Sequence, residues 1–222
     1  MKKIRFLAFI TFVFLLSACS AGGESNAAFE GDPPLSSDYS FIPAGWGVAA
    51  KGDPIVAEGD LNKDGVQDVA MIIEQSESEA EGAPRRVLLI AFGSSAGEFS
   101  LSIIADKVFM RADEGGVWGD PFESLSIDRG SVVVSHYGGS NWRWYSKYRF
   151  RYQDDDWYLI GATKGEHFTG DESRTEEDYN LLTGDYIITT TNEEGVVSTE
   201  KGNRGKKPLV KLGSFDITTE NW

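Results

Sequence analysis

Residues 141–152 read NWRWYSKYRFRY, and this stretch decides the fold class of the chain. The even-numbered positions from Trp142 to Tyr152 carry Trp, Trp, Ser, Tyr, Phe and Tyr, whereas the odd-numbered positions carry Asn, Arg, Tyr, Lys, Arg and Arg. Successive side chains of a β-strand point to opposite faces. The alternation therefore predicts a long strand with one aromatic face and one basic face.

Two interpretations of this strand are open. In the first, which we favour, the aromatic face is core and the basic face pairs with acids on neighbouring strands, since a half-exposed strand buries one face. In the second, the strand is a ligand surface for anions or carbohydrates, with Trp and Tyr rings as stacking platforms. The residues of that surface would be Trp142, Arg143, Trp144, Lys147, Arg149 and Arg151.

The same period of two recurs along the chain, with turn residues between the runs. Hairpin-type turns are predicted at residues 128–131, 154–156 and 192–195. Residues 171–182 are acidic on every face of a helix and allow no assignment. We predict a single mostly β domain over residues 41–222, an antiparallel β-meander arranged as a partial propeller-like or sandwich-like sheet. Its further strands are expected at 66–74, 86–92, 99–105, 125–128, 132–136, 157–162, 186–191, 196–200 and 208–212.

The N-terminal residues have the pattern of a signal peptide. A basic start is followed by an apolar run of eleven residues from Phe6 to Leu16, which is shorter than the roughly 20 residues of a membrane-spanning helix. The sequence Leu16-Ser17-Ala18-Cys19 resembles the lipobox of bacterial lipoproteins. The resemblance implies a signal peptide at residues 1–18 and a diacylated Cys19 as the mature N-terminus. An ordinary signal peptide cleaved near Ala18 is the alternative.

Residues 19–40 are rich in Ser, Gly, Ala, Pro and acids, which predicts a flexible lipidated tether. We expect attachment to a membrane through the N-terminal lipid, in the cell envelope outside the cytoplasm, and on the outer membrane if the host is Gram-negative. Removal of residues 1–18 takes away three of the 21 basic residues and none of the 35 acids, which lowers the formal charge from −14 to −17. So acidic a chain repels nucleic acid, and we expect no nucleic-acid partner.

Residues 59–68 read GDLNKDGVQD and have the spacing of a calcium loop. Oxygen-bearing side chains stand at relative positions 1, 3, 5 and 9, and glycine at position 6 permits a sharp turn around a hard cation. Position 12 is Met71, where an EF-hand needs a bidentate acid. We expect a weak structural site with a Kd on the order of 10⁻⁴–10⁻³ M. The predicted Ca²⁺ ligands are Asp60, Asn62, Asp64, the carbonyl of Val66, and Asp68.

This loop resembles that of the FG-GAP or VCBS type of repeat, in which it links two strands of a propeller blade. The resemblance covers residues 59–99 and includes the sequence FGSSAGEF at 92–99. We find no second copy, and a propeller needs at least four blades. Residues 115–122 and 137–144 also resemble stretches of small, uncharacterised exported bacterial proteins. A Gly/Asp-rich turn that binds no ion is the alternative interpretation of the loop.

Candidate enzymatic motifs are weak. Residues 93–97 read GSSAG and match the G-x-S-x-G nucleophile elbow, but a strand pattern follows where the elbow needs a helix. His136 and His167 are the only histidines, which excludes a His-rich metal site. We therefore favour a calcium-stabilised β module with a binding or envelope-structural role, whose partner is an envelope protein or a glycan. The alternative is a secreted hydrolase that acts on glycan or peptide through carboxylates.

Overall fold

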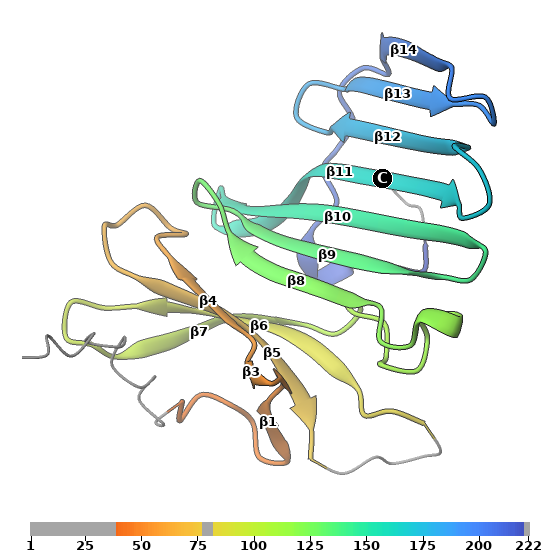
Figure 1. Ribbon diagram of the computed structural model, residues 1–222. Coiled ribbons are helices and arrows are strands. Elements are labelled where there is room, and N and C mark those ends of the chain that lie inside the picture. The colour runs from red at the N-terminus through yellow and green to blue at the C-terminus, as the bar shows by residue number, and fades with distance from the viewer. Residues whose placement is uncertain (1–38, 77–81, 220–222) are drawn as a thin grey trace, which may run out of the picture. The chain divides into compact units, whose positions relative to one another are not determined.

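The computed structural model describes residues 39–76 and 82–219, where nearly all regular structure is antiparallel β-sheet (Figure 1). One five-stranded sheet contains β1 (Trp46–Val48), β4 (Val56–Gly59), β5 (Asp68–Gln75), β6 (Arg86–Gly93) and β7 (Phe99–Ala105). A short ladder joins β2 (Ala50–Lys51) to β3 (Asp53–Pro54). In these residues no helix is long and apolar enough to cross a membrane.

The larger sheet, green to blue in Figure 1, has seven strands that follow one another in chain order. Two 3-10 turns, at Gly116–Trp118 and Leu212–Ser214, flank this meander in the sequence. The strands are β8 (Phe122–Ile127), β9 (Val132–Gly139), β10 (Trp142–Gln153), β11 (Asp156–Phe168), β12 (Arg174–Asn180), β13 (Asp185–Thr191) and β14 (Val197–Asn203).

The predicted fold class is confirmed, and three details of the prediction are corrected. The unassigned acidic stretch contains β12, because its acids find partners on neighbouring strands: the Thr163 hydroxyl, for example, donates to Asp178 Oδ1 over 2.7 Å. Residues 208–212 were predicted as a strand, but they form an extended segment with a single bridge between Tyr158 and Lys211. The short strands β1 to β4 were not predicted, since two to four residues show no readable period.

Strands β5 and β6 are buried on both faces, which explains their continuous apolar sequences. Met71 and Leu89 face a cluster that includes Phe41 and Trp46 from the segment before β2. Ile72 and Ile90 face the opposite way, into a core shared with Val134 and Phe150 of the seven-stranded sheet. The two sheets are therefore joined by one continuous apolar layer.

The segment after β14 completes this layer. It runs back to β11, where the Leu159 N–H donates to the Val210 carbonyl over 2.9 Å. Phe215 then places its ring 5.0 Å from that of Tyr148 and 5.1 Å from that of Phe150, in edge-to-face geometry. Full burial of such a side chain contributes about 1.5–3 kcal/mol. The C-terminal segment is thus a structural part of the core.

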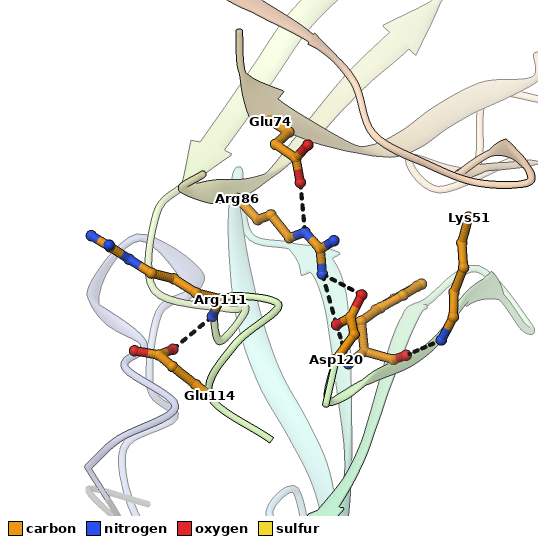
Figure 2. A network of polar contacts seen from close by, with 7 residues as sticks. Lys51, Glu74, Arg86, Arg111, Glu114 and Asp120 are labelled. Carbon is orange, nitrogen blue, oxygen red and sulfur yellow. Dashed lines mark hydrogen bonds and ion pairs between the residues drawn. The ribbon is translucent and has the colours of Figure 1, made fainter. Parts of the chain in front are cut away.

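A buried cation links the two sheets at their edge (Figure 2). Arg86 on β6 donates through Nε to Glu74 on β5 over 2.9 Å, and through Nη1 to both carboxylate oxygens of Asp120 over 2.8 and 2.9 Å. Asp120 precedes β8, and its carboxylate also accepts the Phe122 N–H. Lys51 adds a bond from its ammonium to the Phe122 carbonyl, at 3.1 Å. These contacts fix where β8 begins relative to the smaller sheet.

His136 on β9 is fully buried in the shared layer, and neither ring nitrogen has a hydrogen-bond partner among the described residues. The rings of Phe109 and Tyr148 lie 5.8 and 6.5 Å from it. Burial disfavours the imidazolium and lowers the pKa of His136 to about 4, against a smaller opposing effect of Asp120. The side chain is therefore neutral in the folded protein at neutral pH.

We predict that His136 makes the fold sensitive to acid. Between a pKa of about 6.5 in the unfolded chain and about 4 in the folded protein, the unfolded state binds one more proton. The free energy of unfolding should then fall by about 3 kcal/mol as the pH drops through this window. Denaturant titrations at pH 7 and pH 4 should show a smaller fall for His136→Leu. An equal fall in both proteins would contradict this assignment.

Candidate functional site

Strand β10 has a first half that is partly exposed, which we call the open half, and a second half that is buried in the core. The aromatic face is buried at Tyr148 and Phe150, as the favoured interpretation predicted. At the start of the strand the same face is not covered: Trp144 is half-buried and Trp142 is 50% exposed. The core interpretation therefore describes the second half of the strand, and the first half is free to contact a ligand.

The basic face of β10 departs from the expected pattern of ion pairs with acids. Within the part of the chain that the structure describes, only Arg149 has such an ion pair, with its Nη2 donating to Asp128 Oδ2 over 2.7 Å. Arg151 donates to Gln153, and Arg143 donates to the Gly139 carbonyl over 2.8 Å. Lys147 is exposed and has no ion pair within the described residues. One of the four cations thus pairs with an acid, and that acid lies in the turn between β8 and β9 rather than on a strand next to β10.

A pocket of about 460 Å³ lies on the open half of the aromatic face. Its volume falls within the roughly 300–1,000 Å³ of small-molecule sites. The register of the sheet sets its width: Lys164 on β11 is paired with Ser146 on β10 and with Glu177 on β12. Two side chains, Met110 and Ile217, come from outside the sheet. The lining residues are Met110, Trp144, Tyr145, Ser146, Tyr148, Lys164, Gly165, Glu166, Thr175, Glu177 and Ile217.

Trp144 is held in place by a glycine on the neighbouring strand. It is paired with Gly138 on β9, and a Cβ atom at Gly138 would lie 2.5 Å from the indole ring. The ring therefore occupies the space above Gly138, and a larger residue there would displace it. Tyr145 lies over Gly165 on the opposite face in the same way. Such cross-strand aromatic–glycine pairs fix ring orientation and sheet register.

The far wall of the pocket is charged. The guanidinium of Arg204 pairs with the Glu177 carboxylate, and it lies 4.4 Å from the ring centre of Tyr186. This contact restrains the Glu177 side chain, and Arg204 itself does not line the pocket. Glu166 is the exposed carboxylate on the near side. Sequence reasoning missed both glutamates and Lys164, because only the pairing of β10, β11 and β12 brings them beside Trp144.

A second aromatic cluster lies on the other face of β10. Trp118, 53% exposed, contacts the Tyr137 ring at 4.8 Å, and Arg143 lies 4.9 Å above its indole. The Gly139 N–H donates to the Gly115 carbonyl over 3.0 Å. The two glycine-rich stretches singled out in the sequence, 115–122 and 137–144, are therefore in direct contact.

The predicted calcium loop forms the expected tight turn, with Lys63 at φ 68° and Gly65 at φ 82°. Its side-chain oxygens point to the loop's own backbone: Asp60 accepts the N–H groups of Lys63 and Gly65, and Asp64 accepts that of Val66. Each carboxylate oxygen keeps a second lone pair for a cation. The donor chemistry fits Ca²⁺, although no group of three or more His, Cys, Asp or Glu in the described residues is placed to hold a metal. Calcium binding stays a prediction.

Asp68 has a different environment from the other predicted ligands, because it is fully buried. Its Oδ2 accepts the N–H groups of Leu61 and Asn62 over 2.7 and 3.3 Å, and its Oδ1 accepts that of Gly93 over 2.9 Å. The carboxylate thereby joins the loop to the end of β6. Asp68 therefore stabilises the hairpin unit through three backbone donors, whether or not Ca²⁺ binds to the loop.

Two other features singled out in the sequence are the candidate nucleophile elbow and the lipidation site. The GSSAG stretch is the β6–β7 hairpin turn, in which the Ser94 N–H donates to the Glu98 carbonyl and a strand follows. It therefore lacks the strand–turn–helix geometry of a nucleophile elbow. Cys19 lies outside the described residues.

Comparison with known proteins gives no functional lead. The chain matches no protein-family model, and neither the curated proteins nor the solved structures contain a match to it. The case for a function therefore depends on the geometry of the pocket and the loop.

We predict that Asp68 is the most important residue of the loop for stability. Asp68→Ala leaves one buried and two part-buried N–H groups without an acceptor and should cost about 3 kcal/mol. The exposed Asp64 caps one N–H group, and Asp64→Ala should cost about 1 kcal/mol. Urea denaturation of both variants in chelator measures the difference. Equal costs would show that Asp68 is no more than another turn residue.

Proposed function

We propose that this chain is a lipid-anchored binding module of the cell envelope, and that it holds a carbohydrate in the pocket on the seven-stranded sheet. The observation that carries the proposal is the pocket itself, where an indole ring adjoins hydroxyl, ammonium and carboxylate groups. Sugar rings present apolar C–H faces and hydroxyl edges. An aromatic ring beside a few polar groups matches both features.

The positions of the polar groups support a sugar rather than an apolar ligand. Ser146, Thr175 and Glu166 offer acceptors and donors from three adjacent strands, so hydroxyl groups at several positions of a ring can be satisfied together. Trp144 is fixed by its contact with Gly138. A preformed ring surface costs little conformational entropy on binding.

A carboxylate-dependent hydrolase is the second candidate, because two glutamates line the same pocket. The contact between Arg204 and Glu177 argues against it. Glycoside hydrolysis needs a pair of carboxyl groups that are free to act on the substrate, whereas the Glu177 carboxylate is already engaged by the Arg204 guanidinium. Glu177 is therefore suited to positioning a ligand, and we favour binding over catalysis.

Glycan binding tests the proposal. We expect Trp144→Ala to lower affinity for oligosaccharides by about tenfold, since stacking on an aromatic ring contributes on the order of 1 kcal/mol. Trp118→Ala, which removes an exposed Trp from the opposite face, is the matched control and should bind as wild type does. Glu166→Gln separates the two functions: it should weaken binding, and wild type should release no product from the same glycans. Product formation that disappears in Glu166→Gln would favour the hydrolase.

The anchor and the ion complete the proposal. The lipobox-like sequence at Cys19 supports attachment of the module to a membrane outside the cytoplasm, with residues 19–40 as a tether. The oxygen spacing of residues 60–68, and the turn they adopt, support a structural Ca²⁺ that stabilises the β4–β5 connection. Envelope calcium would then raise stability and leave the pocket chemistry unchanged.

We predict that millimolar Ca²⁺ raises the melting temperature of the wild-type protein relative to chelator. A ligand at about 100 times its Kd adds at most about 2.7 kcal/mol. Asp64→Ala should lose this calcium-dependent increase, whereas Glu123→Ala, which removes an exposed acid on β8, should retain it. Identical melting of wild type in calcium and chelator would leave the loop as a turn alone.

A further inference from the structure

A second pocket, of about 250 Å³, adjoins the first. Met110 and Ile217 line both, so the two pockets meet at these side chains. A single monomer in the first pocket would leave the second one unused. A chain-like ligand that crosses Met110 and Ile217 would occupy both. This inference rests on the proposed function, because it concerns what else the bound carbohydrate carries.

The second pocket differs from the first in charge. Its lining holds four cations and three acids, in a chain whose sequence has 21 basic and 35 acidic residues. This is a local reversal of the overall balance. The charged lining residues are Arg85, Arg86, Asp106, Lys107, Arg111, Glu114 and Asp216.

Three of the four cations are already engaged, including Arg85, whose guanidinium forms an ion pair with Asp106 over 3.8 Å. Arg86 is held by Glu74 and Asp120 (Figure 2). Lys107 donates to Asp216 over 2.9 Å, and contacts with Thr218 and Lys107 lower the pKa of Asp216 to about 2, so this pair is ionised at neutral pH. Neither Arg86 nor Lys107 can therefore turn to a ligand without loss of an internal contact.

Arg111 is placed differently. Its backbone N–H donates to Glu114 Oε2 over 2.6 Å, and the Glu114 N–H returns a bond to the Arg111 carbonyl. These bonds fix the backbone of Arg111 and leave its guanidinium outside the turn. Figure 2 shows the side chain extending away from the Arg86 network. Among the described residues, no carboxylate forms an ion pair with this guanidinium.

We propose that the ligand is an acidic oligosaccharide, with one sugar ring at Trp144 in the first pocket and a carboxylate or phosphate of a neighbouring unit at Arg111 in the second. A planar guanidinium binds such groups through two parallel N–H donors. The neutral part of the ligand gives shape recognition beside Trp144. The anionic part is bound in the second pocket by a guanidinium, a group that is absent from the lining of the first pocket.

The test uses two hexasaccharides of equal length with the full-length protein in detergent. One is a neutral polymer of N-acetylglucosamine, and in the other every second unit is glucuronate. Titration calorimetry at about 0.15 M salt screens charges beyond about 8 Å, which reduces the effect of the overall negative charge. We expect the acidic hexamer to bind about tenfold more tightly, as a charge-assisted hydrogen-bonded contact provides.

The variants distinguish the acidic-ligand inference from the proposed carbohydrate binding on which it rests. Arg111→Gln should remove the preference for the acidic hexamer and leave affinity for the neutral one unchanged. Arg151→Gln, which removes a cation from the outer face of β10, should keep the preference. Equal affinity of wild type for both hexamers, or an equal loss for both in Arg111→Gln, would overturn the acidic-ligand inference while leaving carbohydrate binding intact. If neither hexamer binds, the proposed function itself fails, and this inference fails with it.

Discussion

One face of the seven-stranded sheet has to be covered, and the rest of the structure depends on how far that cover extends. The five-stranded sheet supplies part of it through Ile72 and Ile90, and the C-terminal segment supplies more through Phe215. Together they bury β10 at Tyr148 and Phe150. Where the cover ends, at Trp144, the same aromatic face becomes the wall of a pocket. The pocket thus forms because the aromatic side chains of β10 continue beyond the part of the sheet that the other segments cover.

Two buried charges hold this arrangement in register. Asp68 joins a loop to the end of β6 through backbone donors, and Arg86 joins the smaller sheet to the start of β8 through carboxylates. Each charged group has hydrogen-bond partners within the protein, as burial of an ion requires. Removal of one partner leaves the other uncompensated, which is far more costly than loss of an exposed ion pair. His136, whose ring nitrogens have no hydrogen-bond partner among the described residues, shows the opposite case, in which burial favours the neutral form of the side chain.

The sequence predicts features that depend on neighbouring residues, but it does not predict contacts between residues that are far apart in the chain. The alternation from Trp142 to Tyr152 gave the strand and its two faces, because a period of two needs no tertiary information. It could not show that Phe215 covers only part of the aromatic face. β12 escaped prediction because its acids are balanced by groups such as Thr163 and Arg204 on other segments. The turn at Gly65 could be predicted from the sequence. The hydrogen bond from the Gly93 N–H to Asp68 could not, because the two residues are 25 positions apart.

The overall charge and the local site act at different ranges. A chain with a net charge of −14 slows the approach of an anion at low ionic strength, yet this effect is screened beyond about 8 Å in physiological salt. Affinity is then decided by the groups that touch the ligand. A neutral sugar at Trp144 is insensitive to the overall charge, but an anionic group gains only where a cation is not already engaged. Selectivity for an acidic glycan would therefore rest on Arg111 and its immediate surroundings, and it would persist whatever the charge of the distant strands.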